Sequence, residues 1–221
     1  MDLTDPALQD VKGKKLSIAF NPARAEQLFA GSGHTFSEIL SIADAGKPLP
    51  RFPLAMSLRA TAAMEYSKVE AQNVAGVLPG SDPKVAGEYV VLTAHRDHLG
   101  IGEPINGDKI YNGAMDDASG VASLLEIART FQEKGLHPRR SLIFAAVTAE
   151  EKGLLGAKYY ATNPLYPLNK TLANINMDGV NQWGRTKDIT MVGDDNSTLI
   201  DLLREVAKMQ NRVVNPEPEP E

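Results

Sequence analysis

Two adjacent glutamates, Glu150 and Glu151, are the side chains whose position most clearly indicates chemistry. They follow the apolar run 141–147, where a predicted buried strand gives way to a glycine-containing segment. Neighbouring carboxylates at the end of a buried strand repel each other and are costly to remove from water. A metal ion can compensate such a pair. Glutamates are also favoured in the first turn of a helix, where they complement the helix dipole. The choice between a metal site and a helix start therefore depends on other residues.

A histidine and an aspartate follow a second apolar run. His95 closes the predicted strand 88–95, and Asp97 lies two positions further, on the same side of an extended chain. A carboxylate there can accept the remaining N–H of the imidazole and so fix the tautomer of a metal ligand. A lone histidine is more often structural, and His98 leaves open which of the two imidazoles would bind a metal.

Aspartates end two more segments. Asp116 and Asp117 precede a predicted helix, where Asp117 or Ser119 would serve as an ordinary cap. Asp178 ends another apolar run, although an aspartate before a glycine is also common in turns. In open α/β sheets, ligands bind at the carboxyl ends of the strands. Because the chain has no cysteine, these groups predict a pair of divalent ions held by nitrogen and oxygen, with zinc as the expected metal.

The elements that must position these groups alternate along the chain. Apolar runs predict strands at residues 72–78, 88–95, 141–148, 172–177 and 188–192. Helical periodicity predicts helices at residues 120–134, 151–162 and 197–210. Alternating strands and helices predict a largely parallel sheet covered on both faces.

The beginning of the chain differs from the rest. Residues 23–30 and 35–45 predict two short amphipathic helices, and residues 46–53 form a proline-rich connector. This composition is typical of a boundary. We therefore expect an N-terminal segment at residues 1–55 and a separate domain at residues 56–221.

Composition excludes several classes of protein. The 221 residues are 43% apolar and 23% charged, which is ordinary for a globular chain. The net charge of −5 and the lack of a basic run argue against binding to nucleic acid or to an anionic membrane. No apolar stretch in the sequence is long enough to span a bilayer.

The chain closely resembles the di-zinc aminopeptidases, a family that includes bacterial leucyl aminopeptidases and, more distantly, glutamate carboxypeptidase and the transferrin receptor. The elements His-x-Asp, Gly-Ala-x-Asp-Asp-Ala-Ser-Gly, Glu-Glu-x-Gly-Leu-x-Gly and Asn-x-Asp occur in the family's order between residues 73 and 192. The resemblance implies an α/β/α fold of three layers around a mostly parallel mixed sheet. Residues 1–55 more loosely resemble the tail of a protease-associated domain.

The resemblance also implies roles for individual residues. The implied zinc ligands are one imidazole and three carboxylates: His95, Asp116, Glu151 and Asp178. Asp116 would bridge two zinc ions, with Asp178 on the His95 side. Glu150 would be the general base, which takes a proton from the attacking water and delivers one to the leaving amine. Asp97 would orient His95.

The family pattern requires a second histidine from a loop well beyond Asp178. The chain has four histidines, of which His34 lies in the N-terminal segment and His137 precedes a predicted strand, at the opposite edge of the sheet. The Pro-Glu repeats at residues 215–221 are expected to form a linker or loop. We therefore expect a C-terminally truncated chain, or a natural variant, whose second zinc site is incomplete.

The function implied by the resemblance is hydrolysis of the N-terminal peptide bond of peptides with an unblocked amino terminus. Two alternatives stay open. One is a non-catalytic binding or scaffold protein on the same fold, as the transferrin receptor is. The other is a related di-zinc carboxypeptidase or aminoacylase. Secretion or a periplasmic location is expected from the family.

Overall fold

The computed structural model describes residues 3–5, 8, 19–57, 59, 61, 63, 65, 67–192 and 197–217. The chain divides into two compact units, Met1–Glu70 and Ala71–Glu221. The assignment of residues 1–55 to a protease-associated tail stays a prediction. Within the described ranges, no helix is long and apolar enough to cross a membrane.

The described part of the first unit contains the two short helices that the sequence predicts. They are α1 (Glu26–Phe29), which follows the 3-10 turn η2 (Pro22–Arg24), and α2 (Phe36–Asp44). Thr35 begins α2 with a capping box, in which its side chain and that of Glu38 each bond to the other's main chain. This reciprocal pair satisfies two amide groups that the start of a helix leaves unpaired.

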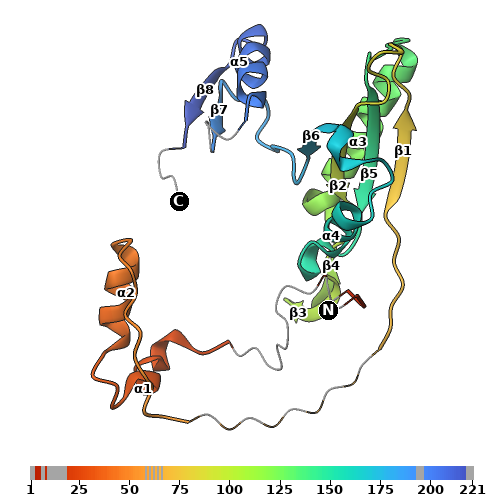
Figure 1. Ribbon diagram of the computed structural model, residues 1–221. Helices are drawn as coiled ribbons and strands as arrows, with labels where there is room; N and C mark the ends of the chain where they lie inside the picture. The colour runs from red at the N-terminus through yellow and green to blue at the C-terminus, as the bar shows by residue number, and fades with distance from the viewer. Residues whose placement is uncertain are drawn as a thin grey trace. The chain divides into compact units, whose positions relative to one another are not determined.

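A four-stranded sheet is the centre of the described part of the second unit (Figure 1). Its strands stand in the order β1 (Val74–Leu78), β5 (Ser141–Val147), β2 (Tyr89–His95) and β6 (Thr171–Asn176). Strand β1 runs antiparallel to β5, whereas β5, β2 and β6 run parallel. The mostly parallel mixed sheet is therefore confirmed, and its three parallel strands end at a common edge.

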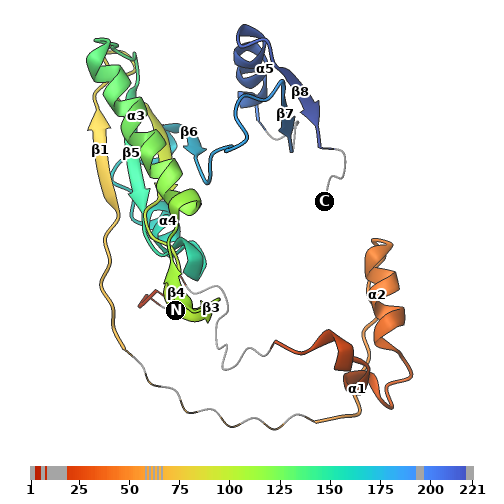
Figure 2. The same cartoon turned by 180° about the vertical axis from the view of Figure 1, so that it is seen from behind.

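Helices lie on both sides of this sheet. Helix α3 (Ser119–Glu133) covers one face, and α4 (Leu155–Thr162) lies on the other side (Figures 1 and 2). Helix α3 ends as the sequence predicts, because Gly135 takes the left-handed conformation that closes a helix (φ 59°). The expected helix at residues 151–162 is divided into the 3-10 turn η4 (Glu150–Lys152) and α4.

The alternation of side chains along β2 explains why both faces are covered. Leu92 and Ala94 pack against Leu124 of α3, while Val91 packs against β5 on the opposite face. Tyr166, which follows α4, stacks on Tyr89 there at a ring-centroid distance of 4.5 Å. A strand that is apolar at successive positions is what a sheet buried on both faces requires.

A hairpin after β2 was not predicted. Strand β3 (Gly100–Ile105) pairs with β4 (Asp108–Tyr111) in an antiparallel ribbon. The turn is Asn106-Gly107, with both residues at positive φ, which is a common hairpin signal. Both strands are almost entirely exposed, so they lack the buried apolar pattern on which the sequence prediction of strands relied.

The C-terminal elements confirm two predictions and correct a third. Strand β7 (Asp188–Met191) and helix α5 (Leu199–Met209) occur where the sequence predicts a strand and a helix. Strand β8 (Val213–Pro216) includes the first residues of the expected linker, so that prediction is wrong for residues 215–216. Parallel pairing with β7 fixes this segment despite its prolines. Residues 218–221 lie outside the described part of the chain.

Candidate metal centre

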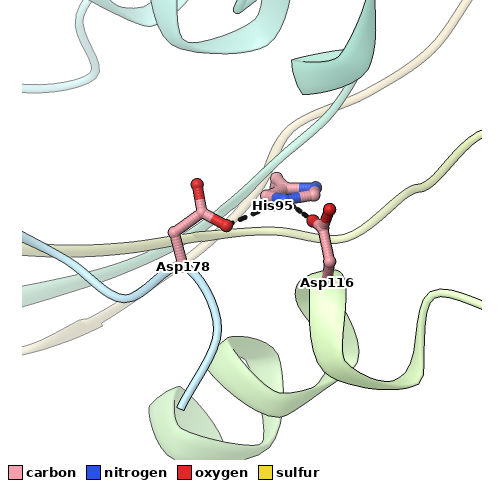
Figure 3. Close-up of side chains that lie close together, drawn as sticks. All are labelled: His95, Asp116 and Asp178. Carbon is pink, nitrogen blue, oxygen red and sulfur yellow. Dashed lines mark ion pairs between the residues drawn. The ribbon is translucent and has the colours of Figure 1, made fainter. Parts of the chain in front are cut away.

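One imidazole and two carboxylates converge at the common edge of the parallel strands (Figure 3). His95 ends β2, Asp116 lies in the turn η3 (Ala114–Ala118) before α3, and Asp178 follows β6. Nε2 of His95 is 2.7 Å from Oδ1 of Asp116 and 3.3 Å from Oδ1 of Asp178. These three side chains form the first donor group.

A second donor group shares Asp116 with the first. Nδ1 of His98 is 2.6 Å from Oε1 of Glu151 and 3.8 Å from Oδ2 of Asp116. Within each group, the candidate ligand atoms lie within 4.8 Å of one another. The sequence left open which histidine would bind a metal, and the structure brings one histidine into each group.

The nitrogen atoms of both groups make close contacts that are not hydrogen bonds. Nε2 of His95 is buried, yet it has no hydrogen-bond partner among the described residues. The same holds, in that part of the chain, for Nδ1 of His98 and Oε1 of Glu151. Buried polar atoms are normally hydrogen-bonded, so unpaired atoms that face one another need another explanation. A cation shared between them supplies it.

The donor atoms in both groups fit zinc. Each group offers one imidazole nitrogen and oxygen atoms from two carboxylates, a mixture that zinc accepts at three protein positions. Asp116 turns one oxygen toward each histidine. A carboxylate shared in this way is suited to a pair of ions held roughly 3.5–4 Å apart.

Asp97 orients His95 through Nδ1, the ring nitrogen that is not part of the donor group. The contact differs from the one that the sequence predicts. Nδ1 of His95 lies 2.8 Å from the main-chain oxygen of Asp97, which replaces the expected contact with the carboxylate. That carboxylate instead accepts hydrogen bonds from the hydroxyl of Thr148 (2.7 Å) and from the main-chain N–H of Ala149. Asp97 therefore holds His95 through its main chain and the segment after β5 through its side chain.

The surroundings of His95 favour positive charge on its ring. Burial lowers the pKa of this imidazole, but the bond to Asp97 and the carboxylates of Asp117, Asp178 and Glu150 outweigh burial. The net result is a pKa above the usual histidine value. The carboxylates around this buried ring stabilise positive charge, which either a proton or a bound cation can supply.

Asp117 connects the three segments that carry the first donor group. Its side chain is buried, with 2% exposure. Its carboxylate accepts hydrogen bonds from the main-chain N–H groups of His95 (3.1 Å), Gly120 (2.8 Å) and Gly179 (3.0 Å). The bond to Gly120 is the helix cap that the sequence suggested. The other two bonds could not be foreseen, because they join residues far apart in the sequence.

Asn73 performs a similar role for the segment after β5, although nothing in its local sequence indicates this. Its side-chain oxygen accepts the N–H of Thr148 (3.0 Å), and its amide donates to the main-chain oxygen of Gly156 (2.8 Å). A Cβ atom on Gly156 would lie 2.6 Å from the Asn73 oxygen, so only glycine permits this contact. The start and end of the segment that carries Glu150 and Glu151 are thus fixed to one side chain.

Glu150 lies among the donor groups without being part of either. Burial raises the pKa of its carboxyl, and the carboxylates of Glu151, Asp178 and Asp116 raise it further, while His95 opposes them. The resulting pKa lies above the ordinary glutamate value. A carboxylate with a raised pKa is better able to accept and return a proton near neutral pH.

The other two histidines lie elsewhere. Nδ1 of His34 is 3.1 Å from Oε1 of Glu38, and its ring lies 4.2 Å from that of Phe52, all within the first unit. His137 is exposed in the segment before β5, at the amino end of that strand. Neither residue is part of a donor group within the described ranges.

Residues 73–221 match the model of Peptidase family M28. The chain is 34% identical over 138 residues to "Aminopeptidase NAALADL1" of Mus musculus, a match that covers 60% of this chain and 17% of that protein. It is 35% identical over 106 residues to "Vacuolar membrane protease" of Verticillium alfalfae, covering 48% of this chain and 9% of that protein. The chain thus spans less than a fifth of the length of these relatives.

Solved structures share the fold. A Zn-dependent exopeptidase from Parabacteroides distasonis superposes with a TM-score of 0.52 at 21% identity, over 70% of this chain and 59% of that one. LapB from Legionella pneumophila gives a TM-score of 0.50 at 25% identity, over 65% and 37% of the respective chains. The α/β fold is therefore that of known zinc exopeptidases.

Proposed function

Because this chain belongs to Peptidase family M28, we propose that it forms the metal-binding part of an aminopeptidase that uses zinc to hydrolyse the N-terminal peptide bond of peptides. The observation that carries the proposal is the pair of donor groups that share Asp116, with Glu150 beside them. Two bound zinc ions would lower the pKa of water and polarise the scissile carbonyl.

The side chains divide this work between them. His95 and Asp178 would hold the first ion, Glu151 would hold the second, and Asp116 would contribute a carboxylate oxygen to each. Glu150 takes a proton from the attacking water and returns a proton to the leaving amine. Its raised pKa supports this role, because a stronger base accepts the first proton more readily.

Preference for an unblocked amino terminus is supported by the chemistry of the site. One of the two ions could also bind the free α-amine of a substrate, whereas the nitrogen of a blocked end is a poor metal ligand. The relative from Mus musculus is named an aminopeptidase. A carboxypeptidase or an aminoacylase would instead accept an N-blocked peptide or amino acid that keeps its free carboxyl end.

The test uses the zinc-loaded chain with leucine p-nitroanilide, N-acetyl-leucine and an N-benzoyl dipeptide that has a free carboxyl end. We expect hydrolysis of the first and little of the other two. Cleavage of N-acetyl-leucine would favour the aminoacylase alternative, and release of the last residue of the N-benzoyl dipeptide would favour the carboxypeptidase alternative.

The role of Glu150 is tested with the variant Glu150→Gln. It should keep its zinc and its fold, while kcat falls by about 100- to 10,000-fold because proton transfer is lost. Glu126→Gln, on the exposed surface of α3, is the matched control and should behave as the unaltered chain does. Normal turnover by Glu150→Gln would contradict the assignment. Absence of both zinc binding and turnover in the unaltered chain would favour the scaffold alternative.

A further inference from the structure

We propose that His98 is the imidazole ligand of the second zinc ion, so that residues 95–178 of this chain supply ligands for both ions. The inference rests on the proposed function, because the second ion is one of the pair which that function needs. It differs from the expectation that a histidine from a loop beyond Asp178 completes the second site.

The contact between His98 and Glu151 is the first reason. Nδ1 of His98 and Oε1 of Glu151 are 2.6 Å apart, which is close enough for a hydrogen bond. The geometry is not that of a hydrogen bond, and in the part of the chain that the structure describes both atoms are buried without any hydrogen-bond partner. Buried donor atoms that are brought together without a hydrogen bond are suited to act as ligands of a shared cation.

The shared aspartate is the second reason. Oδ1 of Asp116 is 2.7 Å from Nε2 of His95, and Oδ2 is 3.8 Å from Nδ1 of His98. The two oxygens of one carboxylate thus face two imidazoles. This is the arrangement expected where a single aspartate bridges two ions, each with its own histidine.

The third reason is that the fold makes room for His98 and holds it in place. Gly113 has φ 64°, and a Cβ atom there would lie 2.7 Å from Cβ of His98 and 3.0 Å from its Cγ. The side chain of Asp97, the residue directly before His98, accepts hydrogen bonds from Thr148 and Ala149. These bonds fix the segment after β2 against the segment that carries Glu151.

The inference is tested by measuring zinc stoichiometry in the 221-residue chain after dialysis against zinc-buffered solution. We expect two ions in the unaltered chain and one in His98→Ala. Loss of a residue that only supports a metal ligand typically lowers metal affinity by about 10- to 100-fold. Because His98 would be a ligand itself, the affinity for the second ion should fall by more than this. His137→Ala is the matched control, because this exposed histidine precedes β5, and it should keep two ions.

Cobalt gives a second measurement that does not depend on activity. Titration of the unaltered chain with Co²⁺ should show two steps in the visible spectrum, and His98→Ala should lose one of them. Circular dichroism checks folding. If His98→Ala does not fold, His98→Gln replaces it, because a neutral amide keeps much of the side-chain volume but is a poor zinc ligand.

The outcomes separate this inference from the proposed function. Two ions retained by His98→Ala, or only one ion in the unaltered chain, would overturn the role of His98 while leaving the first site and the peptidase proposal standing. No zinc in the unaltered chain would overturn both.

Discussion

The two donor groups at the edge of the sheet differ in how firmly the fold holds them. In the first, His95 belongs to a central strand and its side chain is 2% exposed. In the second, His98 and Glu151 follow strands and each is 21% exposed. A ligand on a buried strand has little freedom to lose when it binds a metal, whereas ligands in connecting segments depend on the contacts that hold those segments.

Different side chains support the two groups. The carboxylate of Asp117 joins the main chain at His95, Gly120 and Gly179, and so holds the first group. The second group depends on Asp97 and Asn73, which both bind the segment after β5. The two sites share Asp116 but have separate supports, so substitutions should affect them unequally.

The largest effect is expected for Asp116→Ala, which removes the ligand that both groups share. This side chain is about half exposed, so its loss should cost little folding stability. Zinc content should fall from two ions to none that is tightly held. Loss of charge stabilisation worth several kcal/mol should lower kcat/KM by roughly 1,000-fold or more. Retention of one tightly bound ion would show that the two groups are independent.

Asp117→Ala should destabilise the fold and weaken the first ion more than the second. Three main-chain N–H groups would lose a charged acceptor, and each such bond contributes about 1.5–3 kcal/mol. We expect the free energy of unfolding in urea to fall by about 3 kcal/mol or more. Asp117→Asn, which keeps the size of the side chain, is the control and should lose less. Equal weakening of both ions would contradict separate supports.

Asn73→Ala should instead weaken binding of the second ion more than binding of the first. The N–H of Thr148 and the main-chain oxygen of Gly156 would lose their partner, which costs about 1–2 kcal/mol of stability. The segment that carries Glu151 would be less well fixed, so the affinity for the second ion should fall while that for the first stays unchanged. Isothermal titration with Zn²⁺ measures both. A lower affinity for the first ion as well would show that Asn73 supports both donor groups.

The smallest effect is expected before β2, in the turn between β1 and β2. Hydrogen bonds from the N–H of Lys84 and from the guanidinium of Arg139 hold the pKa of the Asp82 carboxyl below its usual value. Because the pKa is lower in the folded chain, this stabilisation is present above the ordinary carboxyl pKa and is lost as pH falls through the folded pKa.

The stability of Asp82→Asn should therefore fall less than that of the unaltered chain when the pH drops below about 4. Thermal melts between pH 2 and pH 7 measure this difference. Zinc content at neutral pH should not change, because Asp82 belongs to neither donor group. A loss of zinc would mean that this turn influences the metal centre.

Much of the fold could be predicted because the apolar runs of β2 and β5 are buried or half-buried. Alternating apolar residues marked β6, although it is mostly exposed, and each of the three strands ends at or shortly before a residue able to bind metal. The hairpin β3–β4 and the strand β8 were not predicted from the sequence. The first is exposed along its length, and the second exists through pairing with β7. Local sequence carries little signal for strands of either kind.

The sequence by itself determined which residues could bind a metal and at which edge of the sheet they would meet. Parallel strands end together, so the segments that carry these residues could be placed near one another from their order. The resemblance to the di-zinc aminopeptidases implied which residues in those segments bind the metal: His95, Asp116, Glu151 and Asp178. Tertiary structure decided how these residues divide into two groups, since His98 meets Glu151 only when the segments after β2 and β5 are side by side. It also decided the roles of Asp117 and Asn73, because hydrogen bonds between distant segments leave no mark on local sequence.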